Sequence, residues 1–119
     1  MIPKTFELVG RKWTVSAVSP EQYLDEIEGA PIPPESEAAQ HADSGACSHV
    51  FAKIWVVPKK WGSDEYTTIS YFHELAHALF LAMGRVEDSN HPPEEDIELL
   101  GNLLYQYEKT KKGETKLDG

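Results

Sequence analysis

The chain has 119 residues, of which 40% are hydrophobic and 26% are charged, as is usual for a single globular domain. Its net charge is −9, from 20 acidic and 11 basic residues, which disfavours a surface that binds nucleic acid. One cysteine, Cys47, excludes an intrachain disulfide, and no apolar run is long enough for a signal peptide or a membrane span, so we expect a cytoplasmic protein.

The N-terminal third predicts two strands and a short helix. In FELVGRKWTVSAV, apolar residues alternate on either side of a turn at Gly10–Arg11, as in two short strands. SPEQYLDEIEG then predicts a helix, with Ser19 as N-cap, Pro20 at the first helical position and Gln22 completing a capping box. Segment 30–49 is rich in proline and small residues, which indicates an irregular connection.

The remaining elements are one strand and two helices. HVFAKIWVVP is the clearest strand, apolar on both faces and closed by Pro58. The first helix is expected over 69–83, capped by Thr67 or Thr68 and ended by Gly84. Its expected apolar face comprises Ile69, Phe72, Leu75, Ala76, Leu79 and Met83.

The second helix is expected over 94–109, with a buried stripe of Ile97, Leu100, Gly101 and Leu104. The polar segment 109–119 predicts a disordered tail. The chain is therefore expected to be an α+β domain over residues 1–108, a small antiparallel sheet packed on two helices.

The first of these helices contains the pattern H-E-x-x-H at His73, Glu74 and His77. Because a helix turns every 3.6 residues, the two imidazoles project from one face and can bind a single Zn²⁺. Glu74 lies one step round the helix, where it can act as the general base of a metalloprotease. The plainer interpretation is a solvated helix face, but the apolar residues flanking the motif favour a metal site.

A catalytic zinc usually has three protein ligands, so one more is needed. The acids at the start of the second helix, Glu94, Glu95 and Glu98, are candidates, with His91 just before them. Helical phase aligns Glu94 with the buried stripe, Glu98 turns partly inward and Glu95 lies on the flank. The alternative is that these acids only complement the helix dipole.

HELAHALFLAMG followed by EEDIELLGNLL resembles the short zincin-type metallopeptidase domains of phages, related to the ImmA/IrrE family, over residues 50–107. This resemblance implies a gluzincin plan, a peptide or protein substrate, and a phage source. It also implies that Glu94 is the third zinc ligand and that Glu98 holds a ligating histidine from outside. The strand FAKIWVV would then be the edge that pairs with the substrate backbone.

Other assignments stay open at this stage. His91, Tyr66 and Tyr105 are candidates for stabilising an oxyanion. A second metal site from Cys47, His41 and His49 is disfavoured, because their spacing is irregular. The leading hypothesis is a cytoplasmic zinc metallopeptidase that needs no nucleic acid or membrane, with a partner protein that could supply specificity. The alternatives are a non-catalytic, protein-binding module braced by the metal, and an interaction protein without metal, which the intact Glu74 disfavours.

Overall fold

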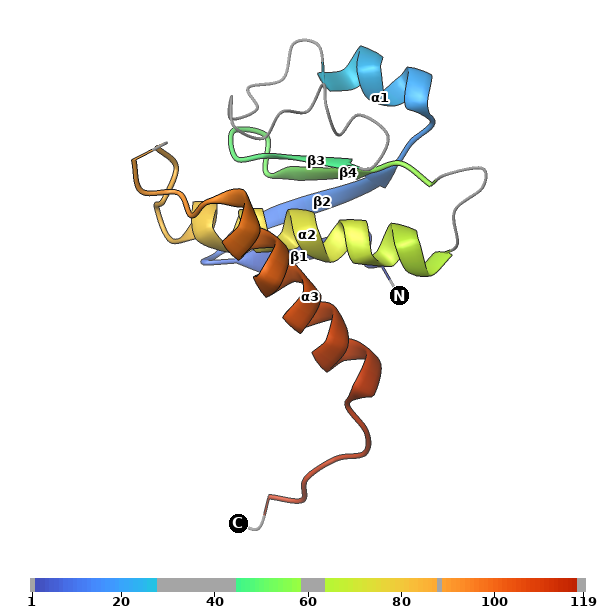
Figure 1. Ribbon diagram of the computed structural model, residues 1–119, viewed down its shortest axis with the longest axis vertical. Coiled ribbons are helices and arrows are strands. Elements are labelled where there is room, and N and C mark those ends of the chain that lie inside the picture. Colours follow the sequence, from blue (N-terminus) through green and yellow to red (C-terminus); the bar gives the residue numbers. More distant parts are fainter. Residues whose placement is uncertain (1, 28–44, 59–63, 88, 118–119) are drawn as a thin grey trace.

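The computed structural model describes residues 2–27, 45–58, 64–87 and 89–117. These residues form an α+β domain with a four-stranded mixed sheet and three helices (Figure 1). The strands are β1 (Thr5–Leu8), β2 (Arg11–Ala17), β3 (Gly45–Ser48) and β4 (Lys53–Val56). The helices are α1 (Pro20–Ile27), α2 (Asp64–Ala82) and α3 (Glu94–Thr110).

The sheet has the strand order β1-β2-β4-β3. The predicted hairpin of β1 and β2 is confirmed: the two strands pair antiparallel, with Phe6 opposite Trp13. The prediction of a purely antiparallel sheet is wrong, because β4 pairs with β2 in parallel. The next described strand after α1 is β3, at the edge of the sheet, and it pairs antiparallel with β4. β4 then lies between β3 and β2 and runs in the same direction as β2, which makes the sheet mixed.

The strand at the edge of the sheet next to α2 is β3, which was not predicted. It lies in the segment that we expected to be irregular; the rest of that segment, residues 30–44, lies outside the described residues. The predicted strand FAKIWVV contains β4, which pairs with β2 on one side and with β3 on the other. The expectation that this strand is the edge is therefore wrong, because β3 covers it.

The sheet is covered on both faces, as the apolar residues of β4 predicted. Ile54 and Val56 belong to the core beneath α2, whereas Trp55 packs on the opposite side with Tyr23 of α1. Figure 1 shows the sheet between α1 and α2. The cap of α1 is confirmed, since the backbone N–H of Gln22 donates a hydrogen bond to Oγ of Ser19.

Helix α2 begins earlier and is buried more widely than predicted. It starts at Asp64, so Thr67 and Thr68 lie inside the helix and the prediction that either caps it is wrong. Its end is confirmed: Gly84 has a φ of +85°, and the N–H of Arg85 bonds to the carbonyl of Phe80, as in a Schellman motif.

The predicted apolar face of α2 is only partly correct. Phe72 and Ala76 are buried, but Met83 is 61% exposed. Helix α2 lies between the sheet and α3, so residues on two of its faces are covered, including Tyr71, Leu81 and the two polar residues Glu74 and His77.

Helix α3 crosses α2 and then extends away from the domain towards the C-terminus (Figure 1). Of the predicted stripe, Ile97 and Gly101 are buried, whereas Leu100 and Leu104 are only half-buried. The helix ends at Thr110, one residue beyond its predicted end, and residues 111–117 are exposed and neither helix nor strand. None of the helices in the described ranges has the length and apolar content needed to span a bilayer.

Candidate metal centre

Helix α2 presents His73 and His77 side by side towards the edge of the sheet. The two residues are one helical turn apart, and their ring centroids are 5.2 Å from each other. The side chain of His77 is 7% exposed and that of His73 is 26% exposed. Their positions follow from the helical repeat, and the packing of α2 under the sheet fixes the direction in which both rings point.

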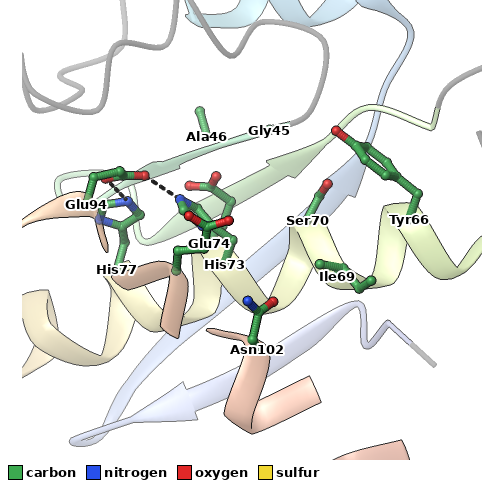
Figure 2. Close-up of a pocket in the computed structure, with 11 residues that line it drawn as sticks. Gly45, Ala46, Tyr66, Ile69, Ser70, His73, Glu74, His77, Glu94 and Asn102 are labelled. Carbon is green, nitrogen blue, oxygen red and sulfur yellow. Dashed lines mark hydrogen bonds and ion pairs between the residues drawn. The ribbon is translucent and has the colours of Figure 1, made fainter. Parts of the chain in front are cut away.

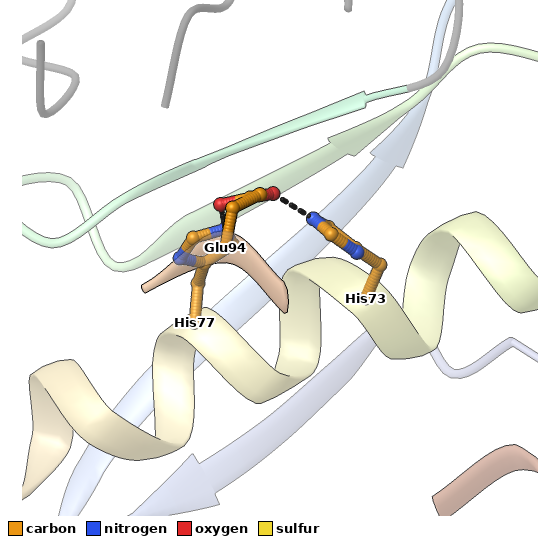
Figure 3. A group of neighbouring side chains, drawn as sticks. All are labelled: His73, His77 and Glu94. Atoms are coloured by element: carbon orange, nitrogen blue, oxygen red, sulfur yellow. Dashed lines mark hydrogen bonds and ion pairs between the residues drawn. The ribbon is translucent and has the colours of Figure 1, made fainter. Parts of the chain in front are cut away.

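Helix α3 adds a carboxylate at its first residue, Glu94. Its Oε1 is 2.5 Å from Nε2 of His73, and its Oε2 is 3.2 Å from Nε2 of His77. Figure 3 shows the carboxylate lying between the two rings, with one oxygen directed to each. One acid thus joins both histidines, as its helical phase indicated, whereas Glu95 is exposed.

These three side chains could hold a metal ion. One donor atom from each of His73, His77 and Glu94 lies within 4.8 Å of the other two. Two imidazole nitrogens and one carboxylate are a ligand set of catalytic zinc sites, and tetrahedral bonds of about 2.0–2.1 Å put neighbouring ligand atoms about 3.3 Å apart. The separation of 3.2 Å between His77 and Glu94 fits this spacing. The His73–Glu94 pair is closer because a hydrogen bond joins these two atoms.

The electrostatics of the trio match a site for a cation. Burial alone would raise the pKa of Glu94, but the polar contacts with His73 and His77 and the charge of these rings hold that pKa well below its ordinary range. Burial alone would lower the pKa of His73. The hydrogen bond to Glu94 and the nearby charges of Glu74, Glu94 and Glu98 outweigh burial and raise that pKa. The pocket is therefore negative in character.

Glu74 stands in the same pocket but not in the trio. Glu74 is 7% exposed and lies on α2, close to β3. A Cβ built on Gly45 of β3 would come 3.4 Å from Cγ of Glu74. Figure 2 shows the pocket between β3, α2 and α3. The side chains and backbone that line it are Gly45, Ala46, Tyr66, Ile69, Ser70, His73, Glu74, His77, Glu94, Glu98 and Asn102.

The other candidates from the sequence occupy different places. Tyr66 lines the pocket, as expected of an oxyanion-stabilising group. Tyr105 does not: its hydroxyl bonds to Glu65 on the outer side of α2 and α3. Glu98 lines the pocket, and its charge acts on His73. Its expected role of holding a ligating histidine from outside stays a prediction.

The residue that supports a histidine from behind is His91. Its Nε2 is 2.8 Å from Nδ1 of His77, and its Nδ1 is 2.9 Å from the carbonyl oxygen of Arg85. His91, a candidate ligand or oxyanion-stabilising group from the sequence, lies in neither position: it contacts His77 and does not line the pocket. Only its proximity to Glu94 in the chain could have pointed to the site.

The residues considered for a second metal site are not gathered near the pocket. Cys47 is buried in the core between the sheet and α2, and burial, with the charge of Glu74, raises the pKa of its thiol well above the ordinary value. His49 lies at the far end of β3, beside Leu81 and Trp13. His41 is outside the described residues.

Comparison of the chain with family models, with curated proteins and with solved structures gives no match. The resemblance to zincin-type metallopeptidases therefore rests on H-E-x-x-H and on the glutamate of the second helix.

Proposed function

We propose that this chain is a zinc-dependent peptidase in which His73, His77 and Glu94 bind the metal. The observation that carries the proposal is the meeting of these three donors with a second buried carboxylate, Glu74, in one open pocket. Zn²⁺ bound there would polarise the carbonyl of a peptide bond and make water a stronger acid.

Glu74 is the residue proposed to move the proton. Its carboxylate accepts a proton from the attacking water as the water oxygen bonds to the carbonyl carbon. It then delivers that proton to the amide nitrogen as the C–N bond breaks. Its position next to both histidines, on the same helix, supports this role because it brings the base to the wall of the pocket.

A peptide is the proposed substrate because the pocket lies beside a strand. Gly45 and Ala46 of β3 form the upper wall of the pocket (Figure 2). In the described sheet β3 is an edge strand. The backbone groups at the edge of a sheet can pair with an extended peptide. In this proposal β3, rather than FAKIWVV, guides the substrate, and the single free cysteine is consistent with action in the cytoplasm.

The test compares the wild-type protein with Glu74→Gln. The variant should keep about one zinc per chain by elemental analysis, and should lose roughly 10²–10⁴-fold in cleavage of a mixed peptide library followed by mass spectrometry. Glu95→Gln is the matched control, since it removes an exposed acid from α3, and it should cleave normally. Equal cleavage by wild type and Glu74→Gln would contradict the role of Glu74.

The second candidate function is a metal-braced, non-catalytic protein-binding module. One observation favours it: Glu94 begins α3 and contacts two residues of α2, so a metal at this point would clamp one helix on the other. Small domains often gain much of their stability from such a clamp. Tight zinc binding with a large rise in melting temperature, but no cleavage by the wild type, would support this function instead.

A further inference from the structure

A chain of two histidines and a carbonyl stands behind the metal site. The carbonyl oxygen of Arg85, the ring of His91 and the ring of His77 are joined by contacts of 2.9 Å and 2.8 Å. The two rings are nearly coplanar, at 3°, with centroids 5.1 Å apart. His91 is 9% exposed, so these contacts are largely shielded from water.

The loop between α2 and α3 holds His91 in this position. The N–H of His91 donates to the carbonyl of Glu87, and the N–H of Glu87 donates to Oδ1 of Asn90. These two bonds close the turn that precedes α3. The edge of the Phe80 ring also packs near the His91 ring, with centroids 6.4 Å apart. The backbone of the loop and the side chains of His77 and Phe80 in α2 thus hold the His91 ring in place.

The direction of the hydrogen bonds follows from the Arg85 carbonyl, which can only accept. Nδ1 of His91 must therefore carry a proton. A neutral imidazole has one proton, so Nε2 of His91 is an acceptor, and the group facing it, Nδ1 of His77, must be the donor. The other nitrogen of His77, Nε2, faces Oε2 of Glu94 across 3.2 Å. In this tautomer Nε2 keeps its lone pair, which a metal ion between His77 and Glu94 would bind.

We propose that His91 is a positioning residue that fixes the Nδ1–H tautomer of His77 and so presents Nε2 of His77 to the metal. This inference rests on the proposed metal centre. A ligating histidine that donates its other ring N–H is held in orientation and made more basic, and loss of such a partner typically lowers metal affinity about 10–100-fold.

The other histidine of the trio provides an internal comparison. In the described part of the chain, His73 has its hydrogen bond to Glu94 and none on its second ring nitrogen. The two histidines are therefore unequal: the ring of His77 contacts both His91 and Glu94, whereas the ring of His73 contacts Glu94 alone. A change at His91 should alter the tautomer of His77 and leave that of His73 as it was.

The first measurement is the tautomer in zinc-free, ¹⁵N-histidine-labelled full-length protein. Long-range ¹H–¹⁵N correlation spectra should be recorded at about pH 8, well above the ordinary histidine pKa of about 6.5. We expect signals of an Nδ1–H tautomer for both His77 and His91. An Nε2–H tautomer of His77, with His91 as the donor, would overturn the proposal whether or not the protein binds zinc.

The second measurement uses variants of His91. His91→Phe keeps a ring against His77 and Phe80 but has no nitrogen, so the preference of His77 for Nδ1–H should be lost and zinc affinity should fall about 10–100-fold by chelator competition. His91→Gln should restore much of both, because its amide oxygen can accept the His77 proton. His49→Phe, a histidine change away from the pocket, should alter neither.

These outcomes separate the inference from the function it rests on. An unchanged His77 tautomer in a folded His91→Phe protein would overturn the positioning role. Failure of the wild type to take up zinc would contradict the metal centre, and the spectra would still decide which way the hydrogen bonds run. If His91→Phe does not fold, the His77 tautomer in the wild-type protein and in His91→Gln still tests the proposal.

Discussion

Gly101 of α3 lies directly against the backbone of His73 in α2. A Cβ at position 101 would come 2.9 Å from Cα of His73 and 3.0 Å from the carbonyl oxygen of Phe72. Both atoms belong to the backbone of a buried helix, so neither can move aside cheaply. The absence of a side chain at Gly101 therefore sets how closely α3 approaches the metal helix, and with it where Glu94 stands.

We expect Gly101→Ala to destabilise the fold and to weaken zinc binding. Alanine in place of glycine favours an isolated helix by about 1 kcal/mol, but overpacking a buried contact typically costs about 1–3 kcal/mol. The cost of the clash should exceed the gain in helix propensity, because the clash is with backbone atoms of α2. Urea denaturation and chelator competition measure the two effects. Gln106→Ala, on the exposed side of α3, is the control, and a Gly101→Ala protein more stable than wild type would contradict this account.

Three of the acids near the start of α3 should differ in their effect on zinc affinity. Glu94→Ala should weaken binding most, because Glu94 contacts both histidines. Glu98→Ala should have an intermediate effect, since this acid acts on His73 through its charge, and Glu95→Ala should have almost none. Competitive chelator titration of the three variants gives the order. A site emptied by Glu95→Ala would mean that the phase of α3 is wrong.

Acid should weaken the contact between the outer ends of α2 and α3. The hydrogen bond from Lys109, with that from Tyr105 and the charge of Lys109, lowers the pKa of Glu65. A carboxylate with a lowered pKa in the folded state stabilises the fold above its unfolded pKa of about 4.3, and this contribution is lost as the pH falls through the folded value.

In Glu65→Gln, the free energy of unfolding should therefore fall less steeply than in the wild type as the pH drops below about 5. High salt should reduce the difference between the two proteins, because Glu65 is exposed. Denaturation midpoints measured from pH 7 down to about pH 3 test this. Glu108→Gln is a matched control, since its ion pair is with Lys111, the residue that follows α3, and not with α2. An equal change in both variants would contradict the role of the interhelix contact.

Cys47 should be unreactive in the folded protein. Cys47 is 3% exposed, and burial together with the charge of Glu74 raises the pKa of its thiol well above the ordinary value, so little thiolate forms at neutral pH. Mass spectrometry should show slow labelling by a thiol reagent in buffer and rapid labelling in denaturant. Fast stoichiometric labelling of the native protein would show that the core beneath α2 opens readily.

Local rules accounted for the features that depend on a few neighbouring residues. The helical repeat placed His73 and His77 on one face, the cap at Ser19 began α1, and the glycine at position 84 ended α2. Each of these is decided by backbone geometry within about one or two turns, so the residue types at those positions are sufficient to predict it. The inward phase of Glu94 in α3 belongs to the same class.

Contacts between distant segments decided the rest. Gly45–Ser48 has no apolar alternation, and it forms a strand because β4 offers hydrogen-bonding groups and because Gly45 has no side chain: a Cβ there would come 2.6 Å from the Trp55 carbonyl. That pairing made β3 the edge and β4 an interior strand. A propensity argument sees only the segment itself, so it could not foresee a strand whose stability comes from its partner.

The same reason explains the surroundings of the metal centre. Helical phase could turn Glu94 inward, but the crossing of α3 over α2 at Gly101 decided which atoms of the two histidines it meets. His91 reaches His77 through a loop whose shape follows no repeat. Periodicity determines the side of a helix on which a residue lies. Which group it touches depends on how whole elements pack, and that is settled only when the chain has folded.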